Sequence, residues 1–501
     1  MNEVLQYCWG AVLDLCTPTG ILFLFGGSLI GLVLGSLPGL SGGTLTVLLL
    51  PIMYKIEPVM AMALLISIYT SSTSGGCIGS ILLGIPGTNS SIATVWDGYE
   101  FTKQGNPVRP LSVAVICNFI GTLPSMLIAM ICCKALAEIA VKMGPWEYAG
   151  MCFCAVALVV GLTKGNMAKG LIGVGLAIVL SSMGPDPLTG MRRLTFDVKS
   201  LYGGINVIQL MLGMFAAKVI MLEYSRRDKV DAAKRIKVDR FRWPGKDLKS
   251  NLGNMFRSFF TGAFIGFLPG LGGPTSTVVA YSTERSLSKE KEKWGKGHIG
   301  GVIAPEIANN AGIGGALIPM IALGVPGDAA MVHFMAALQS QGINPGPLLM
   351  SSHPDIAYML FVGGIICAVF VLICEIVGMP LFPKLLKIPY HYLYPAIIVV
   401  SFIGAYMVKG NMFGMIVCLG ACVLGIFMEY FEIPEMPFIM TVILSSLLEK
   451  NIRQGMNFSF VGFAEFFTRP VSCIFIVVGL AMLLWHAFGG LVIKALRKKS
   501  K

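Results

Sequence analysis

Long apolar runs dominate the pattern of hydrophobic and polar positions along this chain. They include Leu111–Cys133, Val207–Met221 with its extension back toward Leu201, and Val471–Phe488. A helix of about 18 to 20 residues, rising 1.5 Å per residue, crosses a hydrocarbon core of about 30 Å. The pattern therefore predicts an all-α polytopic membrane protein. We expect about five or six crossings in each half, roughly 11–12 in total.

Motifs recur in the same order on either side of a basic segment, Tyr224–Ser250, near the middle of the chain. Their offsets run from 231 residues (Gly31 to Gly262) to 245 residues (Thr163 to Val408). The pairs are GLVLGSLPGLSGGTLTV (31–47) with GAFIGFLPGLGGPTSTV (262–278), GIPGT (84–88) with GVPGD (324–328), KQGNP (103–107) with SQGINP (340–345), and TKGNMAKG (163–170) with VKGNMFGM (408–415). Four matches in register indicate an internal repeat.

The repeat suggests a division of the chain into three parts. Residues 1–223 form a first membrane repeat, 224–250 a basic linker, and 251–501 a second repeat ending in a C-terminal helix and a basic tail. Repeated membrane proteins with interrupted spans resemble secondary transporters, which bind substrate where the repeats meet. We expect such a chain to work like an elevator, with transport blocks moving against a scaffold. Whether the repeat is inverted depends on the number of crossings in each half.

Composition agrees with a membrane location. Of the 501 residues, 55% are hydrophobic and 13% charged, whereas a soluble domain has about 25% charged residues. The formal net charge of +12 is concentrated in the linker and in the tail IKALRKKSK, without an aromatic-spaced motif for nucleic acid. Basic loops beside spans face the cytoplasm by the positive-inside rule, so we place both segments there.

The chemistry expected of the chain needs no cofactor. The thirteen cysteines lie mostly inside apolar runs and show no metal-ligand spacing, so we interpret them as small buried hydrophobes. The sequence has no G-x-x-x-x-G-K-[ST] motif and no H-E-x-x-H motif, so we expect neither ATP hydrolysis nor another enzymatic activity. Apart from sodium as a coupling ion, no metal is predicted.

Proline-glycine pairs interrupt apolar stretches at matched places in the two halves. Proline cannot donate its N–H, and glycine opens the backbone further. A helix that stops inside a membrane leaves unpaired carbonyls, and the helix that follows leaves unpaired N–H groups, which protein, water or ligand must meet. The N–H groups and the positive end of the helix dipole favour a carboxylate, whereas the carbonyls favour a cation. The alternative is that these pairs mark ordinary loops at the membrane surface.

Residues at these breaks are therefore candidates for two kinds of site. The candidates for substrate binding are Ser41, Gly42, Thr88, Asn89, Ser90, Thr275, Ser276 and Asn310. The candidates for the coupling ion are Gly39, Gly87, Gly270, Glu306, Asn309, Gly327 and Asp328.

The segment PEIANNAGIGG (305–315) adds a carboxylate and two amides to the second half. If it is helical, Glu306 lies on the same face as Asn309 and Asn310. Polar groups at such a depth are costly, which favours an ion or substrate site over a satisfied contact between helices. Asp328 is either a helix N-cap or a cation ligand.

Other polar residues are weaker candidates. We expect Asp97 to cap the loop that leaves the membrane, and we expect His333 to be structural. Glu449 lies close to Arg453 in the sequence, which favours an ion pair at a helix end, and Glu375 lies inside an apolar run.

Several segments together resemble the large permease subunit of the bacterial tripartite tricarboxylate transporters, the TctA family. The similarity runs from about Leu22 to about Arg469. The segments are GSLPGLSGGT, GGCIGSILLGIPGT, DGYEFTKQGNP, APEIANNAGIGGALIPMIALGVPG and SSLLEKNIRQGM. One departure is YTSSTSGG (69–76), where the family has a bulkier, more aromatic approach to the paired glycines.

The resemblance implies a multi-pass protein of the bacterial inner membrane that imports citrate or other di- or tricarboxylates. It also implies two partners: a small four-helix membrane subunit (TctB-like) and a periplasmic solute-binding protein (TctC-like) that delivers the substrate. A sodium or proton gradient would drive uptake without ATP. The resemblance places the substrate and ion sites in PGTNSS, PGDAA, PGLSGG, PGLGGP and PEIANN, and dimerisation stays open.

Two other functions are compatible with a polytopic chain. A channel for small anions would use similar loops but would not need a coupling-ion site at residues such as Glu306. A membrane-embedded enzyme or an assembly scaffold would require a catalytic pair, which the sequence does not offer. We therefore favour a secondary active carboxylate importer.

Overall fold

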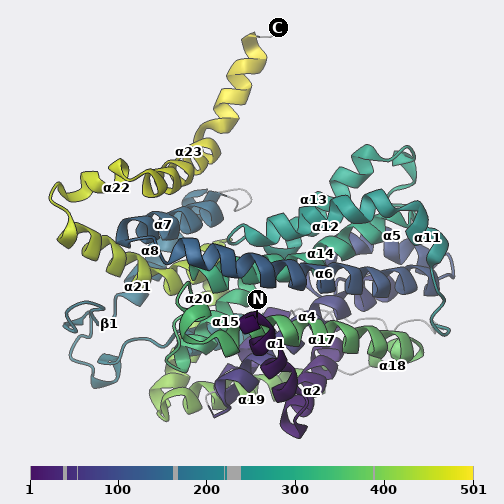
Figure 1. Ribbon diagram of the computed structural model, residues 1–501, viewed down its shortest axis with the longest axis horizontal. Coiled ribbons are helices and arrows are strands. Elements are labelled where there is room, and N and C mark those ends of the chain that lie inside the picture. The colour runs from purple at the N-terminus through teal and green to yellow at the C-terminus, as the bar shows by residue number, and fades with distance from the viewer. Residues whose placement is uncertain are drawn as a thin grey trace. The chain divides into compact units, whose positions relative to one another are not determined.

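The computed structural model describes residues 2–37, 42–53, 55–161, 167–218, 220–222, 238–386 and 390–499. The predicted positions Gly39 and Ser41, and most of the basic linker, lie outside these residues. The described chain is predominantly helical (Figure 1). Its strands within these ranges are one short antiparallel pair, β1 (Gly184–Pro185) and β2 (Arg192–Arg193).

Five described helices are long and apolar enough to cross a membrane. A bent pair, Gly462–Thr468 with Pro470–Trp485, would supply a sixth span. The five segments are Pro18–Gly35, Pro58–Leu83, Val108–Ala140, Pro354–Leu385 and Met412–Tyr430. Together they confirm the all-α polytopic class, and shorter apolar helices such as Pro145–Gly161 and Met167–Ser181 accompany them. The total of 11–12 crossings stays a prediction.

The chain folds into two compact units, and each unit takes one stretch from either side of the basic linker. The first unit comprises Met1–Ala137 and Val219–Gly404, and the second comprises Glu138–Lys218 and Ala405–Lys501. This division concerns contacts in space, whereas the division into repeats concerns the sequence and stays a prediction.

The first unit contains both pairs of interrupted helices. Its elements are α1 (Asn2–Leu15), α2 (Pro18–Gly35), α3 (Gly42–Met53), α4 (Pro58–Leu83), η1 (Asn89–Ser91), α5 (Ile92–Lys103), α6 (Val108–Ala140), α11 (Gly245–Ser250), α12 (Leu252–Phe267), α13 (Gly272–Leu287), η4 (Lys291–Lys293), α14 (Gly300–Leu323), α15 (Ala329–Ser340), α16 (Leu349–Ser352), α17 (Pro354–Gly378), η5 (Met379–Leu381), α18 (Phe382–Leu385) and α19 (Tyr390–Lys409).

The second unit is also helical. Its elements are α7 (Pro145–Gly161), α8 (Met167–Ser181), the β1–β2 pair, η2 (Lys199–Leu201), α9 (Val207–Met211), the π-helix η3 (Leu212–Ala217), α20 (Met412–Tyr430), α21 (Glu435–Phe458), η6 (Gly462–Ala464), α22 (Glu465–Thr468) and α23 (Pro470–Lys499). Within this unit α7 packs against α21 and α23, and α20 packs against η3.

Glycines let helices of the first unit pack backbone to backbone. In the first half α2 packs along α4, and in the second half α12 packs along α14. A Cβ atom on Gly31 would lie 2.1 Å from Ser71 Oγ and 2.7 Å from the Ile68 carbonyl oxygen. A Cβ atom on Gly262, the matching residue, would lie 2.2 Å from the Ala308 carbonyl oxygen. Small residues that permit such close approach are typical of helix pairs in membranes.

The two halves interlock within the first unit. The α5 helix, from the first half, packs against α13 and α14 of the second half, whereas α15, from the second half, packs against α3 of the first. Every residue in the apolar window of α4 is buried, and nearly all of α14 is buried as well. These two helices therefore form the core of the first unit.

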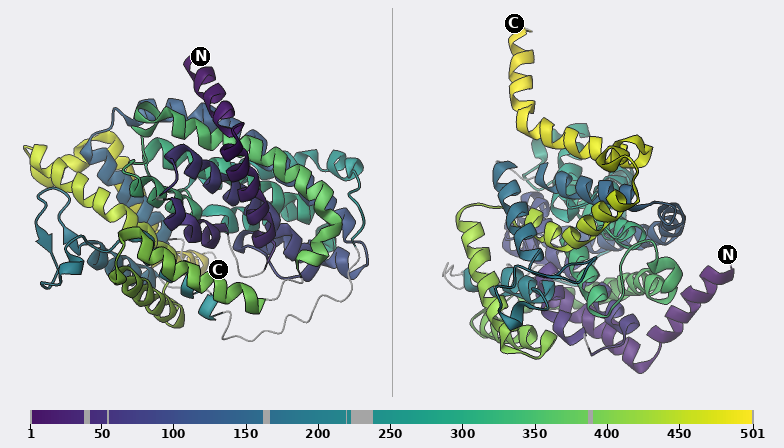
Figure 2. Two further views of the ribbon diagram at one scale, coloured as in Figure 1. Left: turned by 90° about the horizontal axis from the view of Figure 1, so that it is seen from below. Right: turned by 90° about the vertical axis from the view of Figure 1, so that its left-hand side faces the viewer.

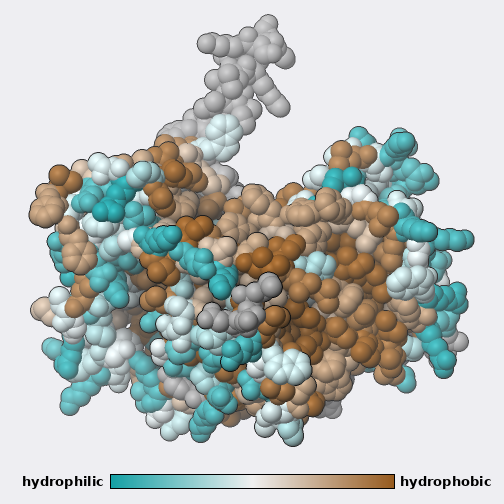
Figure 3. All heavy atoms as spheres, in the orientation of Figure 1, coloured by the Kyte–Doolittle hydropathy of each residue, from teal (hydrophilic) through white to brown (hydrophobic). Residues whose placement is uncertain are grey.

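Other helices face outward and carry apolar side chains. On the face drawn in Figure 3, apolar residues cover the region of α6 and α17, and polar residues take over toward α11. Ile131 on α6 is 71% exposed and Val377 on α17 is 73% exposed. The α1 helix packs against α17 (Figure 2). There the centroid of the Tyr7 ring lies 5.8 Å from that of Tyr358, and the two rings are stacked. Such outward apolar surfaces match the hydrocarbon of a bilayer.

Replacing Gly31 with valine tests the close packing of α2 on α4. Because the new side chain would overlap Ser71 and the Ile68 carbonyl, we expect a loss of about 1–3 kcal/mol in stability, measured as a lower midpoint of thermal unfolding in detergent. Gly26→Val in the same helix is the control, since a Cβ atom there meets nothing within 4 Å. Equal unfolding midpoints for the two variants would contradict this packing.

Candidate functional site

The Pro-Gly corners after α4 and α14 have the same structure in both halves. Each helix ends at a glycine in the left-handed conformation, Gly84 with φ of 71° and Gly324 with φ of 73°, which is a common helix C-cap. A Cβ atom on Gly87 would lie 2.5 Å from the Gly35 carbonyl oxygen, and one on Gly327 would lie 2.6 Å from the Gly266 carbonyl oxygen. The matched sequences therefore make matched contacts, and only glycine fits these two positions.

In the second half, the two breaks meet. The Gly270 N–H donates a hydrogen bond of 2.8 Å to the Gly327 carbonyl oxygen. Gly272, at the start of α13, has φ of 57°, and its Cβ atom would lie 2.9 Å from Asp328 Cβ. The predicted positions Gly270, Gly327 and Asp328 are thus neighbours. In the first half, the counterpart includes the undescribed Gly39 and Ser41, and α3 begins at Gly42.

The corner of the first half reaches the second half at Gly273. A Cβ atom on Gly273 would lie 2.8 Å from both Asn309 Oδ1 and Ser90 Cβ. Asn309 is buried and its amide nitrogen lies 3.5 Å from the Thr73 carbonyl oxygen of α4. Ser90 is half-buried and Asn89 is exposed. Candidates from both halves therefore come together beside the first turn of α13.

The remaining hydroxyl candidates lie in the turns that begin α5 and α13. The Thr88 N–H donates to Ser91 Oγ at 3.2 Å, and Ser91 Oγ donates to the Thr88 carbonyl at 2.8 Å, so this pair caps the turn before α5. Ser276 Oγ donates to the Gly273 carbonyl at 2.8 Å, and Thr275 is half-buried beside it.

Asp328 is the N-cap of α15. Its Oδ1 accepts the Met331 N–H at 2.9 Å, and its Oδ2 accepts the hydroxyl of Tyr69. Tyr69 opens the segment YTSSTSGG on α4, so a contact between the halves holds this carboxylate. The expected N-cap is confirmed, and a cation at Asp328 stays a prediction.

Glu306 and Asn310 belong to a polar cluster inside the first unit, and both are completely buried. Asn310 Oδ1 accepts from Ser74 Oγ at 3.0 Å and from Thr122 Oγ1 at 3.2 Å. The Asn310 amide nitrogen donates to the Glu306 carbonyl at 3.0 Å. The Glu306 carboxylate accepts the hydroxyl of Thr94 on α5. Side chains of α4, α5, α6 and α14 therefore meet at one point.

Asn118 on α6 joins this cluster to a second buried carboxylate, although we did not single it out in the sequence. One end of its amide lies 2.9 Å from Glu306 Oε2, and the other end lies 3.5 Å from Glu375 Oε1. Glu375 is completely buried on α17, and its Oε2 has no hydrogen-bond partner among the described residues. The signal in the sequence was a polar pair, Asn118 and Thr122, one helical turn apart in an apolar run.

The two carboxylates have no cationic partner within the described part of the chain: no lysine or arginine forms an ion pair with Glu306 or Glu375 there. Those residues also contain no group of three or more His, Cys, Asp and Glu side chains that could hold a metal ion. Two negative charges in a dry interior repel each other and lack solvation. A proton or a monovalent cation bound at the cluster would compensate them.

Asp97 and His333 have structural roles. Asp97 is buried inside α5, where its Oδ1 accepts the N–H groups of Gly295, Gly297 and His298 at 2.7–2.9 Å. It thus fixes the loop between α13 and α14, whereas we expected it to cap the loop after its own helix. His333 is buried on α15 with its Nδ1 2.8 Å from Thr46 Oγ1 on α3.

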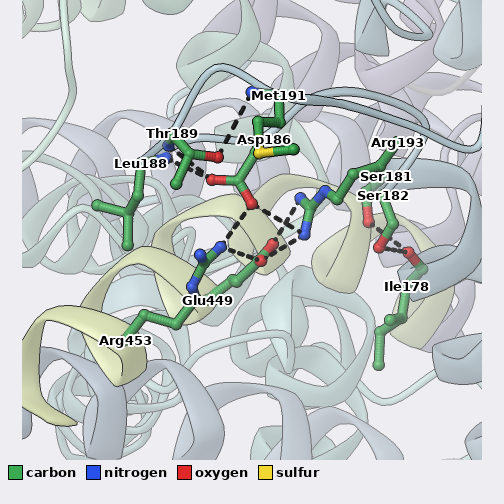
Figure 4. A network of polar contacts seen from close by, with 10 residues as sticks. All are labelled: Ile178, Ser181, Ser182, Asp186, Leu188, Thr189, Met191, Arg193, Glu449 and Arg453. Atoms are coloured by element: carbon green, nitrogen blue, oxygen red, sulfur yellow. Dashed lines mark hydrogen bonds and ion pairs between the residues drawn. The ribbon is translucent and has the colours of Figure 1, made fainter. Parts of the chain in front are cut away.

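Glu449 takes part in a network of charges in the second unit (Figure 4). Its carboxylate binds Arg453 Nη1 at 3.1 Å, as expected, and also Arg193 at 2.6 Å. Arg453 in turn contacts Asp186 at 2.5 Å. The N–H groups of Thr189 and Leu188, together with Arg453, hold the pKa of Asp186 below its usual value. Two acids balance two arginines, so this network fastens the loop that contains β1 and β2.

Known proteins resemble this chain over most of its length. The sequence profile of the tripartite tricarboxylate transporter TctA family matches residues 21–440 of this chain. The uncharacterized 52.8 kDa protein in the TAR-I ttuC' 3' region of Agrobacterium vitis is 32% identical over 471 residues, which cover 93% of this chain and 92% of that protein. An uncharacterized protein in the TAR-II ttuC' 3' region of the same organism is 32% identical over 228 residues, 44% of this chain and 92% of that protein. No solved structure matches the chain.

Proposed function

Because the chain belongs to the tripartite tricarboxylate transporter TctA family, we propose that it imports di- or tricarboxylates such as citrate. Uptake uses a sodium or proton gradient. A periplasmic solute-binding protein delivers the substrate, and a small four-helix subunit completes the permease in the bacterial inner membrane. The central basic loop and the C-terminus face the cytoplasm, as the distribution of lysine and arginine favours.

The observation that carries this proposal is the convergence of breaks from both halves beside the first turn of α13. There Ser90 of the first half and Asn309 of the second both lie against Gly273. The start of a 16-residue helix offers N–H groups and a positive dipole to a carboxylate. In our proposal the substrate contacts Thr88, Asn89 and Ser90, together with the residues from the other breaks, namely Ser41, Gly42, Thr275, Ser276 and Asn310.

The coupling ion binds at the carbonyl-rich corners and at the buried acids. The corner candidates are Gly39, Gly87, Gly270, Gly327 and Asp328, and the deeper candidates are Glu306 and Asn309. The lack of a cationic partner for Glu306 in the described residues supports an ion at this depth. During transport, one compact unit moves and carries the site with it. The other unit serves as the scaffold.

Counterflow in proteoliposomes tests the function directly. Vesicles loaded with unlabelled citrate or a dicarboxylate should take up the labelled compound against its gradient, because a carrier exchanges one molecule for another. Uptake into empty vesicles should rise when a sodium or proton gradient is imposed, and comparison of the two gradients identifies the ion. Uptake without counterflow and without dependence on either gradient would instead indicate an anion channel.

Replacing Asn89 with leucine tests the substrate site. The exposed amide would be exchanged for an apolar side chain of similar size, so we expect the KM for citrate to rise about tenfold or more, equivalent to about 1.4 kcal/mol or more. Asn106→Leu is the control, because Asn106 is also exposed but lies in the loop after α5. If Asn89→Leu transports with the kinetics of Asn106→Leu, the substrate does not bind at this corner.

Replacing Glu306 with glutamine tests the ion site. Glutamine keeps the size of the side chain but cannot release a proton or carry a negative charge, so we expect gradient-driven accumulation to fall by at least tenfold while counterflow persists. Glu306→Ala should also abolish accumulation. Glu292→Gln, at an exposed position in η4, is the control and should transport normally. Normal accumulation by both Glu306 variants would remove this residue from coupling.

A further inference from the structure

A cavity of about 960 Å³ lies in the first unit between α5, from Val95 to Lys103, and the C-terminal part of α13. The breaks that form the candidate substrate site are at the N-terminal ends of these helices, which span 12 and 16 residues. The cationic end of the cavity, at Lys103 and Arg285, is about 18 Å along the helices from the breaks at Ser91 and Gly273, at 1.5 Å per residue. It is therefore a separate feature that needs its own explanation.

Aromatic rings form one wall of the cavity. The Trp96 and Tyr281 ring centroids are 4.7 Å apart, and those of Tyr281 and Trp294 are 5.0 Å apart. The hydrogen bond from the Tyr281 hydroxyl to Asp97 Oδ2, at 2.8 Å, fixes this wall in place. The indole N–H of Trp294 is buried and has no acceptor among the described residues. Tryptophan and tyrosine are enriched at the boundary between the hydrocarbon and the headgroups of a membrane.

The charged side chains that line the cavity have an excess of positive charge. Lys103 lines it and is paired with Glu100 at 2.6 Å. Arg285 and Lys291 also line it, both are exposed, and neither forms an ion pair with any described residue. Three cations against one carboxylate leave two positive charges uncompensated. An anion in the cavity would restore the balance.

The polarity of α5 changes along its exposed face. On α5, Ile92 and Trp96 are exposed one turn apart, at 43% and 41%, and Lys103 follows two turns later on the same side. An apolar approach that ends in cations fits an amphiphile with an anionic head. A free carboxylate or phosphate would leave the apolar part unused.

The cavity lies at the end of the unit that the charge pattern places toward the cytoplasm. The α6 helix begins only a few residues after Lys103, and its Arg109 binds Asp247 of α11 through two hydrogen bonds of 2.7 and 3.0 Å. The α11 helix belongs to the basic segment 224–250, which the positive-inside rule assigns to the cytoplasm. Anionic lipids of that leaflet attract lysine and arginine side chains near the membrane surface.

We propose that this cavity binds the phosphate headgroup of an anionic phospholipid from the cytoplasmic leaflet. Arg285 and Lys291 contact the phosphate, and the hydroxyls of Ser282 and Ser286, which also line the cavity, lie within the same headgroup region. The acyl chain follows the exposed face of α5 past Trp96 and Ile92. This site is independent of the proposed carboxylate transport.

Lipid binding to the purified full-length protein in detergent tests this proposal, with phosphatidylglycerol as the probe and phosphatidylcholine as the neutral comparison. Native mass spectrometry reports the bound lipid. We expect phosphatidylglycerol to bind preferentially. The double variant Arg285→Gln/Lys291→Gln should lose about 30-fold in affinity for it, from about fivefold for each charge. The double variant Lys289→Gln/Lys296→Gln removes two exposed charges that do not line the cavity and should change the affinity less than threefold.

Three outcomes would overturn the proposal. Equal binding of the two lipids would show that charge is not recognised. Equal losses in the two double variants would show that the cavity is not the site. Binding of glycerol phosphate with the affinity of the lipid would show a site for soluble anions. Unchanged thermal unfolding of both double variants confirms that a loss of lipid is not a loss of fold, and if Arg285→Gln/Lys291→Gln unfolds early, the single variants give the same comparison.

Discussion

The backbone of a helix that is interrupted inside a membrane protein must find partners for its unpaired polar groups, and the rest of this structure depends on that constraint. In the second half one such partner is another stretch of backbone, and glycine lets the backbones at both corners approach closely. Gly87 lies against the Gly35 carbonyl and Gly327 against the Gly266 carbonyl, while Gly270 donates to Gly327. These contacts require α2 to lie directly on α4 and α12 directly on α14. The helix packing and the corners are thus parts of one arrangement.

A second consequence is that buried polarity collects around the same helices. With α4 and α14 enclosed, the side chains on them can only be satisfied by one another or by something that enters the protein. Asn310 is satisfied by Ser74 and Thr122. The carboxylates of Glu306 and Glu375 lie at opposite ends of the Asn118 amide, which can donate to only one of them, and neither has a cation among the described residues. Stable burial of both acids requires a compensating charge. That requirement links the fold to the proposed coupling of transport to an ion.

Local features of the fold could be predicted from the sequence, but contacts between the halves could not. Proline-glycine chemistry and the repeat located the corners, and residue type left Asp328 as either an N-cap or a cation ligand. Helical spacing placed Glu306 and Asn310 near each other, although Asn309 contacts a different neighbour, Gly273. The exchange of α5 and α15 between halves, the Tyr69–Asp328 contact and the bridging position of Asn118 depend on tertiary packing. No periodicity within a single segment encodes these contacts. The hydrogen bonds by which Asp97 fixes the loop between α13 and α14 could not be predicted for the same reason.

The central claim is that breaks from both halves hold the substrate together. An experimental density map of the protein in nanodiscs, saturated with citrate, tests it most directly. The account predicts ligand density between Ser90 and the first turn of α13, with carboxylate oxygens near the N–H groups of Gly273 and Thr275. Ligand density elsewhere in the protein, with the Pro-Gly corners separated and facing bulk water, would contradict it.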